Sequence, residues 1–316
     1  MRKVFGTSVL ALAAVLALSV PAQLAAKDEP KAAAAAEAPK IPPELLALEK
    51  GLHPQTGDVR IPEAKAVLHL GDRYYFLPAA EARRVLVEVW RNPPDAVSDV
   101  LGLVLEKDTT IFKNVWGAVI TYRDSGHVSD ADAGSQDYAQ VLTDMQQGEA
   151  EDNRQRKAAG YPTMQLVGWA QAPSYDQGSH ALIWARELAS EGMQVNSLNY
   201  DVRLLGRTGV LSLNMVSDMS AIGDVRTAAQ AFGKAVTFEP GAAYADYNAS
   251  TDKTAEYGLA GLVAGGAAVA VAKKIGLLGL ILAFGKKFIV LIGIGIAALV
   301  GAVGKMMGRN KEEDVI

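Results

Sequence analysis

Residues 198–216 read LNYDVRLLGRTGVLSLNMV, and this stretch decides the fold class. In its first half, the apolar Tyr200, Val202 and Leu204 alternate with polar residues, and the second half repeats the alternation. A period of two predicts two half-buried strands, and the short Gly-rich link at 206–209 predicts a tight hairpin between them. We therefore expect an antiparallel sheet with one face exposed to water.

Further strand candidates lie on both sides of this hairpin. They are short, rich in β-branched or aromatic residues, and bounded by Gly, Pro, Asp or Asn. They comprise residues 66–70, 74–77, 100–105, 116–122, 164–171 and 180–188, beside 198–205 and 210–216 of the hairpin. Helices are predicted at 79–90, 136–159 and 220–235. This order predicts an α+β domain in which helices pack against an antiparallel sheet, a layout similar to PsbP/Mog1-like domains.

Composition restricts the classes of function. The 316 residues include 31 basic and 35 acidic side chains, which gives a formal net charge of −4. A near-neutral chain without a long basic block is not expected to bind nucleic acid. The lack of cysteine excludes disulfides and thiolate metal sites. Because HExxH, GxSxG and GxxxxGK[ST] motifs are also missing, we expect neither a metal nor another cofactor.

The N-terminal end has the pattern of a secretory signal peptide at residues 1–26. Two basic residues precede an uncharged run that ends in small residues, and we expect cleavage after Ala26, with Ala22 as the second candidate. The alternative is an uncleaved anchor. Residues 27–43, rich in Ala, Lys and Pro, are predicted to be a flexible linker before a domain at 44–250.

The C-terminal end holds hydrophobic pieces separated by lysine pairs. Residues 251–285 are predicted to be juxtamembrane, because the pieces are short and joining them would place two lysines near the bilayer centre. Residues 286–305 contain an uncharged run close to the lower limit of about 17 residues for a spanning helix. A charged tail follows at 306–316. The alternative is a helical hairpin within 258–305.

Small residues recur every fourth position in the predicted spanning helix, at Gly293, Ala297 and Gly301. Such a face lets two helix backbones approach closely in lipid. We therefore expect self-association or contact with a partner protein through this helix, in addition to contact with membrane lipid. Together with the signal peptide, the helix predicts a membrane protein whose main domain lies outside the cytoplasm.

The segment GWAQAPSYDQGSHALIWAREL, residues 168–188, carries the most unusual combination of side chains. Its two tryptophans are predicted to lie on paired strands, which would allow them to stack across the hairpin, and packing in the core is favoured over a ligand-binding surface. The turn supplies acid and base candidates, although turn chemistry alone also favours an aspartate. The candidate ligand or interaction site is Trp169, Tyr175, Asp176, His180 and Trp184.

An acidic loop lies at residues 122–137, with Asp124, Asp130 and Asp132 among its carboxylates. Its beginning is similar to a calcium-binding loop, but the later ligand positions do not hold oxygen donors. We expect the loop to cap the helix that follows it.

Four stretches together resemble one family. They are WGAVITYRDSGHVSDADA, GWAQAPSYD with HALIWAREL, LNYDVRLLGRTGVLSLN and STDKTAEYGLAGLVAGG. These stretches resemble bacterial membrane-anchored proteins labelled as domain of unknown function 2167. The resemblance implies an envelope location and a C-terminal anchor, and it supplies no reaction. His127 stands where that family is expected to have tyrosine, which disfavours a catalytic role for this histidine.

The sequence thus predicts a membrane-anchored periplasmic domain that binds a protein or an envelope component without catalysing a reaction. The alternative is a hydrolase-like enzyme that uses Tyr175, Asp176 and His180. An enzyme should bring these three side chains together in a deep pocket, whereas a binding domain should not.

Overall fold

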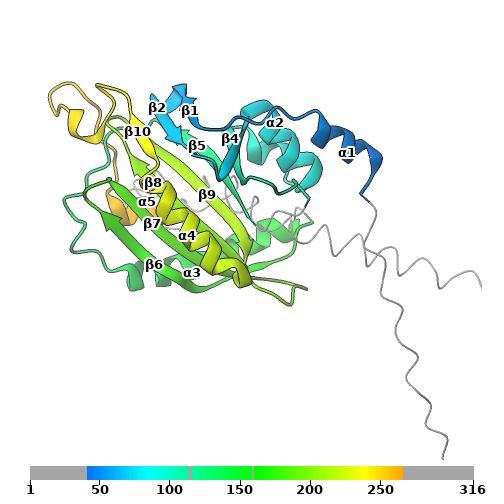
Figure 1. The fold of residues 1–316 in the computed structure, drawn as a ribbon. Coiled ribbons are helices and arrows are strands. Elements are labelled where there is room, and N and C mark those ends of the chain that lie inside the picture. The colour runs from blue at the N-terminus through cyan, green and yellow to red at the C-terminus, as the bar shows by residue number, and fades with distance from the viewer. Residues whose placement is uncertain (1–40, 113–115, 159, 266–316) are drawn as a thin grey trace, which may run out of the picture. The chain divides into compact units, whose positions relative to one another are not determined.

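The structure is a computed structural model that describes residues 41–112, 116–158 and 160–265 (Figure 1). The predicted signal peptide, most of the linker, the predicted spanning helix and the charged tail lie outside the described residues. Gly293, Ala297 and Gly301 lie outside them as well. Within the described ranges, no helix combines the length and apolarity needed to cross a bilayer.

A seven-stranded antiparallel sheet forms the centre of the domain. Its order is β3-β4-β5-β9-β8-β7-β6. The strands are β3 (Tyr74–Pro78), β4 (Val100–Glu106), β5 (Gly117–Arg123), β6 (Met164–Asp176), β7 (Ala181–Ser190), β8 (Ser197–Leu205) and β9 (Val210–Asp218). A smaller antiparallel sheet has the order β1-β2-β10, with β1 (Asp58–Ile61), β2 (Ala66–His69) and β10 (Val236–Phe238). The predicted antiparallel α+β class is confirmed, while the short β1 and β10 were not predicted.

The predicted hairpin is the pair β8–β9 in the interior of the large sheet. Its register runs from Ser197 opposite Asp218 to Leu205 opposite Val210. Gly209 is required in the turn, because a Cβ atom there would lie 2.2 Å from the carbonyl oxygen of Arg123. The turn therefore packs directly against the end of β5.

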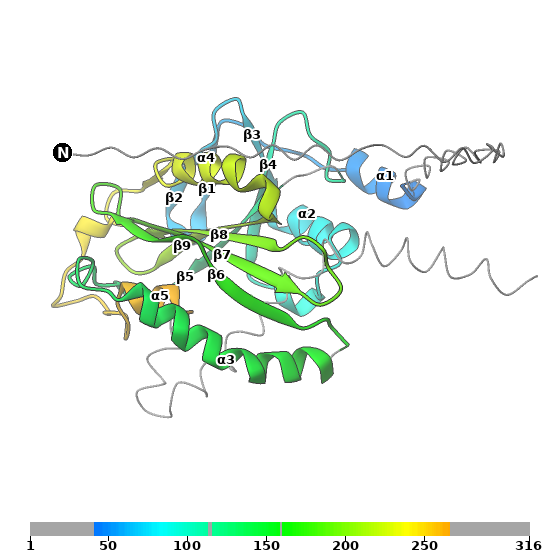
Figure 2. The ribbon, with the colours of Figure 1, turned by 90° about the horizontal axis from the view of Figure 1, so that it is seen from below.

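Helices cover both faces of the large sheet (Figure 2). They are α1 (Pro43–Lys50), α2 (Ala79–Arg84), α3 (Tyr138–Ala158), α4 (Ile222–Phe232) and α5 (Leu259–Val263). A π-helical turn, η2 (Val85–Val89), continues α2, and 3₁₀ turns occur at η1 (Pro62–Ala64), η3 (Pro94–Val97), η4 (Met219–Ala221) and η5 (Tyr244–Asp246). The three predicted helices correspond to α2 with η2, to α3, and to η4 with α4.

Helix α4 covers one face through an aromatic contact with the strands. The ring centroid of Phe232 lies 4.9 Å from that of Tyr74 and 6.0 Å from that of Trp116. All three side chains are buried, together with Val225 and Ala229 on the same side of the helix. This is the packing that the helical spacing in 220–235 predicts.

The prediction that the other face is exposed to water is wrong. Asp201 on β8 is fully buried and accepts hydrogen bonds from Arg186 at 3.0 Å, from Arg203 at 2.6 Å and from Asn214 at 2.9 Å. Asn199 is also buried and donates to Asn214 at 3.2 Å. Apolar clusters that include residues of α2, α3 and α5 surround this polar centre. Polar residues alternate here because they bond to one another, not because they face solvent.

Helix α3 shields the outer edge of β6. The side-chain amide of Asn153 donates to the Met164 carbonyl at 2.7 Å and accepts from the Met164 amide at 2.8 Å. Gln146 donates to the Leu166 carbonyl at 2.9 Å, and Glu149 accepts from the Leu166 amide. These side chains satisfy an edge that would otherwise expose unpaired backbone groups. Burial raises the pKa of Glu149 and contributes most to raising that of Asp152 to about 7.

The first prediction concerns the aromatic contact beneath α4. Phe232→Ala should lower the free energy of unfolding by about 3–5 kcal/mol, because it removes a buried ring and leaves a cavity. Gln230→Ala, at an exposed position of the same helix, should change it by less than about 0.5 kcal/mol. Denaturant unfolding of the full-length protein in detergent measures both values, and equal losses would contradict the packing described.

Candidate functional site

Four separate segments meet at one end of the large sheet. They are the β6–β7 turn, the β8–β9 turn, the loop after β5, and residues 239–258, which we call the strap. The strap runs from the end of β10 to α5 (Figure 1). Backbone hydrogen bonds attach it: His127 donates to Lys253, and Ala255 donates to His127, both at 2.8 Å. Arg207 in the β8–β9 turn donates to Ala242 at 2.9 Å.

Tyr175, His180 and Asp130 form the polar part of this site. The Tyr175 hydroxyl donates to Asp130 Oδ2 at 2.8 Å and lies 3.0 Å from His180 Nδ1. His180 Nδ1 lies 3.8 Å from the same carboxylate oxygen. The backbone of His180 has a φ of 48°, in the left-handed region, where it ends the β6–β7 turn. The predicted turn and the predicted acidic loop therefore supply one cluster.

A stack of four aromatic rings runs from His180 to the strap. In order they are His180, Tyr244, His127 and Tyr247, with centroid separations of 4.2 Å, 4.3 Å and 3.8 Å between neighbours. The Tyr244 hydroxyl donates to the Val128 carbonyl at 2.9 Å and accepts from the Asp130 amide at 3.1 Å. The stack thus joins the β6–β7 turn, the loop after β5, and the strap.

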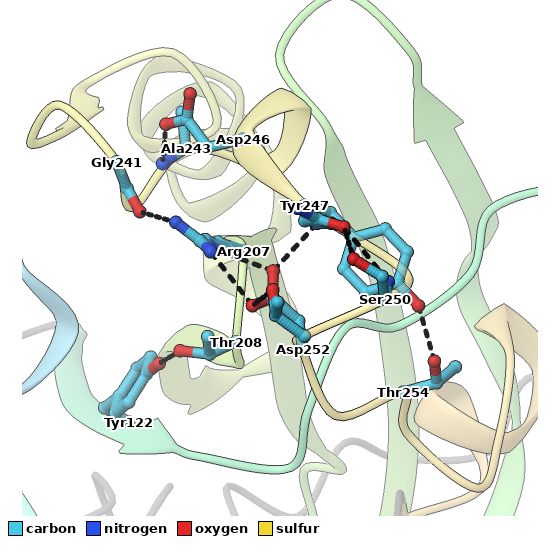
Figure 3. Close-up of polar contacts among 12 residues, drawn as sticks. Tyr122, Arg207, Thr208, Gly241, Ala243, Asp246, Tyr247, Ser250, Asp252 and Thr254 are labelled. Carbon is cyan, nitrogen blue, oxygen red and sulfur yellow. Dashed lines mark hydrogen bonds and ion pairs between the residues drawn. The ribbon is translucent and has the colours of Figure 1, made fainter.

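An ion pair fastens the strap to the β8–β9 turn (Figure 3). Arg207 donates from Nε to Asp252 Oδ2 at 2.7 Å and from Nη2 to Oδ1 at 2.9 Å. Its Nη1 reaches the Gly241 carbonyl at 3.1 Å. The Asn248 amide donates to Asp252 at 2.8 Å, so the carboxylate also orders its own loop. The Arg207 hydrogen bond holds the pKa of Asp252 well below its usual range.

The local environment keeps the tyrosines of the cluster protonated. Burial raises the pKa of Tyr175, and its hydrogen bond to Asp130 raises it further. The pKa of Tyr244 is raised by the same causes. A phenol held as a donor to a carboxylate is not poised to act as a nucleophile or a base. Burial lowers the pKa of His127.

The remaining residues of the predicted hairpin site do not join this cluster. Asp176 is exposed and accepts from the Ser179 amide at 2.9 Å, as a turn residue does. Trp169 donates to the Tyr138 carbonyl at 3.0 Å, while Trp184 is buried below the guanidinium of Arg203. The register places Trp169 opposite Arg186 and Trp184 opposite Asp201, so the two indole rings do not lie directly opposite each other across the hairpin. Both tryptophans belong to a packed cluster with Leu182 and Leu259.

The acidic loop divides into residues with different roles. Asp137 accepts from the amides of Ala139 and Gln140, each at 3.0 Å, so the loop caps α3 as predicted. Asp132 accepts from Gln136 at 2.7 Å, and Asp124 is exposed. Within the described part of the chain, no three His, Asp or Glu side chains are grouped as a metal site would require.

A hollow of about 600 Å³ lies elsewhere, between α3 and the ends of β6 and β7. Its lining includes Gln146, Asn153, Thr163 and Ser190, and none of the hairpin-site residues. The acid and base candidates Tyr175, Asp176 and His180 therefore do not line this hollow.

Sequence reasoning missed the strap's share of the site. The residues it did not connect lie in three separate segments that no local spacing links: His127, Arg207, and the strap residues Tyr244, Tyr247 and Asp252. One signal in the sequence pointed to these residues, because two of the distinctive stretches cover 116–133 and 250–266. The structure shows that these stretches run side by side, with His127 bridged to Thr254.

Residues 251–263, which were predicted to be juxtamembrane, pack against the domain in the structure. Tyr257, Leu259, Leu262 and Val263 are all buried in the cluster that contains Trp184. The folded domain therefore continues beyond residue 250.

Comparison with known proteins gives a family and a distant structural likeness. No curated protein matches the chain. It is similar to the solution structure of cyanobacterial PsbP (CyanoP) from Synechocystis sp. PCC 6803, with 6% identity over 60% of this chain and 92% of that chain, at a TM-score of 0.33. The family model described as Protein of unknown function (DUF2167) matches residues 53–302 of the 316. Because this match covers most of the sequence and all four of the distinctive stretches up to Gly266, the chain belongs to the DUF2167 family.

Proposed function

We propose that the protein is a membrane-anchored domain of the bacterial envelope that binds a protein or envelope component and catalyses no reaction. One observation carries this proposal: Tyr175 and His180, two of the three acid and base candidates, are bonded to one another and contact the strap. The Tyr175 hydroxyl donates a hydrogen bond to Asp130, and His180 lies against both Tyr175 and Tyr244. Side chains used in this way hold segments together rather than awaiting a substrate.

The geometry also weakens the hydrolase alternative. That alternative needs Asp176 beside His180, but the carboxylate found there is Asp130. The described hollow lies between α3 and the ends of β6 and β7, away from these groups. A binding role needs none of these conditions, and it suits a domain whose turns and loops gather at one end of a rigid sheet.

The location is part of the proposal and is supported by the sequence. The signal-peptide pattern and the uncharged run within 286–305 support a main domain in the periplasm, held at the inner membrane by a C-terminal helix. We propose membrane lipid and a protein partner, or a second copy, as its contacts, without nucleic acid or cofactor. The PsbP/Mog1-like layout stays a prediction from the order of elements.

Because the chain has no cysteine, single introduced cysteines report topology without background. Val195 is half exposed on the folded domain, so Val195→Cys should react with a membrane-impermeant maleimide in spheroplasts. Ile316→Cys should react only after lysis if one helix spans the membrane. Labelling at both positions would select the hairpin, and protection of Val195→Cys until lysis would contradict the periplasmic location.

Association through the predicted helix is tested by a change in side-chain size. Ala297→Ile should abolish a membrane two-hybrid signal between two copies of the helix, because it separates backbones that small residues allow to approach. Leu299→Ile, off the small-residue face, is the matched control and should keep the signal. A two-hybrid signal that survives Ala297→Ile would contradict the proposed self-association.

A substitution at Tyr175 distinguishes the binding hypothesis from the enzyme hypothesis. Tyr175→Phe should lower the free energy of unfolding by about 1–3 kcal/mol, because it leaves Asp130 without its hydroxyl donor. Asp176→Ala, in the exposed turn, should leave the melting temperature close to that of the wild type. Denaturant and thermal unfolding measure these effects. If Tyr175→Phe abolished a cellular phenotype while the stability and expression of the variant protein stayed unchanged, the enzyme hypothesis would be favoured.

A further inference from the structure

Two different fasteners hold the strap, and they respond differently to protons. The first is the ion pair of Arg207 with Asp252, whose carboxylate has a pKa far below its usual range. It therefore stays ionised throughout the range in which histidines titrate. The second is the ring stack, which contains His127 and His180.

His127 is held in a setting that suits the neutral imidazole. Its side chain lies between the rings of Tyr244 and Tyr247, and the residue is only 8% exposed. One ring nitrogen bonds to the backbone of Arg207, while Nδ1 is buried without a hydrogen-bond partner. Protonation would place an N–H at Nδ1 with no acceptor within reach, which costs free energy in a buried site.

The groups around His127 act in opposite directions. Desolvation is the largest effect and lowers the pKa of His127, and a charge on His180 lowers it too. The hydrogen bond to the Arg207 backbone is the largest effect that raises it, Asp130 and Asp252 raise it as well, and the two tyrosine faces attract a cation weakly. Other titratable or charged residues packed around the stack are Tyr175 on β6, Asp132 in the acidic loop, Arg207 in the β8–β9 turn, and Asp246 and Lys253 in the strap.

We propose that the strap is an acid-sensitive fastening, in which protonation of His127 opens its contact with the loop after β5. Opening breaks the ring stack and the backbone bonds from His127 to Lys253 and from Ala255 to His127. The Arg207–Asp252 pair keeps the strap attached near its middle. The residues released include 253–255, which lie between this ion pair and α5, and α5 stays packed in the cluster that contains Trp184.

The direction follows from proton linkage. In the opened state, His127 has the ordinary histidine pKa of about 6.5, and in the fastened state its pKa is lower. Below pH 6.5 the fastened state therefore holds fewer protons than the opened state. Its free-energy advantage over the opened state declines as the pH falls through this range. Between pH 7.5 and 5.5, one such group can raise the opening equilibrium by at most about tenfold.

Hydrogen–deuterium exchange of the full-length protein in detergent tests this proposal. The amides of His127 and Ala255 report the strap, and that of Leu213 in β9 is the reference. After correction for intrinsic exchange, the opening equilibrium at the strap should rise three- to tenfold from pH 7.5 to pH 5.5 relative to the reference. A rise of less than twofold overturns the proposal.

Variants assign the effect to one side chain. His127→Phe keeps a ring in the stack and cannot be protonated, so its opening should change less than twofold between the two pH values. His127→Tyr serves the same purpose if the first variant does not fold. His53→Gln, at a solvent-exposed histidine, is the matched control and should keep the wild-type response. A wild-type response in His127→Phe or His127→Tyr, or its loss in His53→Gln, overturns the assignment.

Discussion

The buried carboxylate of Asp201 is the constraint on which the large sheet depends. Two guanidinium groups, from Arg186 and Arg203, converge on it from neighbouring positions of β7 and β8. Burying a charge without a partner is expensive, so these side chains can lie inside the domain only as a set. Burial lowers the pKa of Arg203, and Asp201 opposes that shift, which keeps the guanidinium charged. With the charge of Asp201 paired, apolar clusters can close over the same face.

Much of the fold could be predicted from sequence because its strands are local signals. The alternation of apolar and polar residues predicted β8 and β9. Gly, Pro and Asn marked the ends of most of the other strands. Alternation identifies the residues that share a face, but it does not reveal what covers that face. Asn199, Asp201 and Asn214 therefore had the pattern of a wet surface, although they are buried. The short β1 and β10 depend on pairing with β2, and pairing between distant segments leaves little trace in four residues.

The candidate site was predictable in pieces and not as a whole. Tyr175, His180 and Asp130 were each singled out, but nothing local shows that a turn and an acidic loop 45 positions apart meet. Their meeting follows from the strand order, which places the turns of β6–β7 and β8–β9 at the same end of the sheet. The strap then crosses that end because the chain returns from β10, an element that sequence reasoning missed. Asp176 was chosen for its chemistry, and its role is that of a turn residue.

The pairing of α3 with β6 has a consequence for behaviour in a crowded compartment. A bare strand edge recruits strands from neighbouring chains, and this recruitment begins aggregates. Here Asn153 and Glu149 occupy the backbone groups that an incoming strand would need. The helix is largely polar on its outer side, while its few apolar side chains pack on the sheet. One element thus both closes the core and denies this edge to another chain, so its loss would expose an apolar surface and an unpaired strand together.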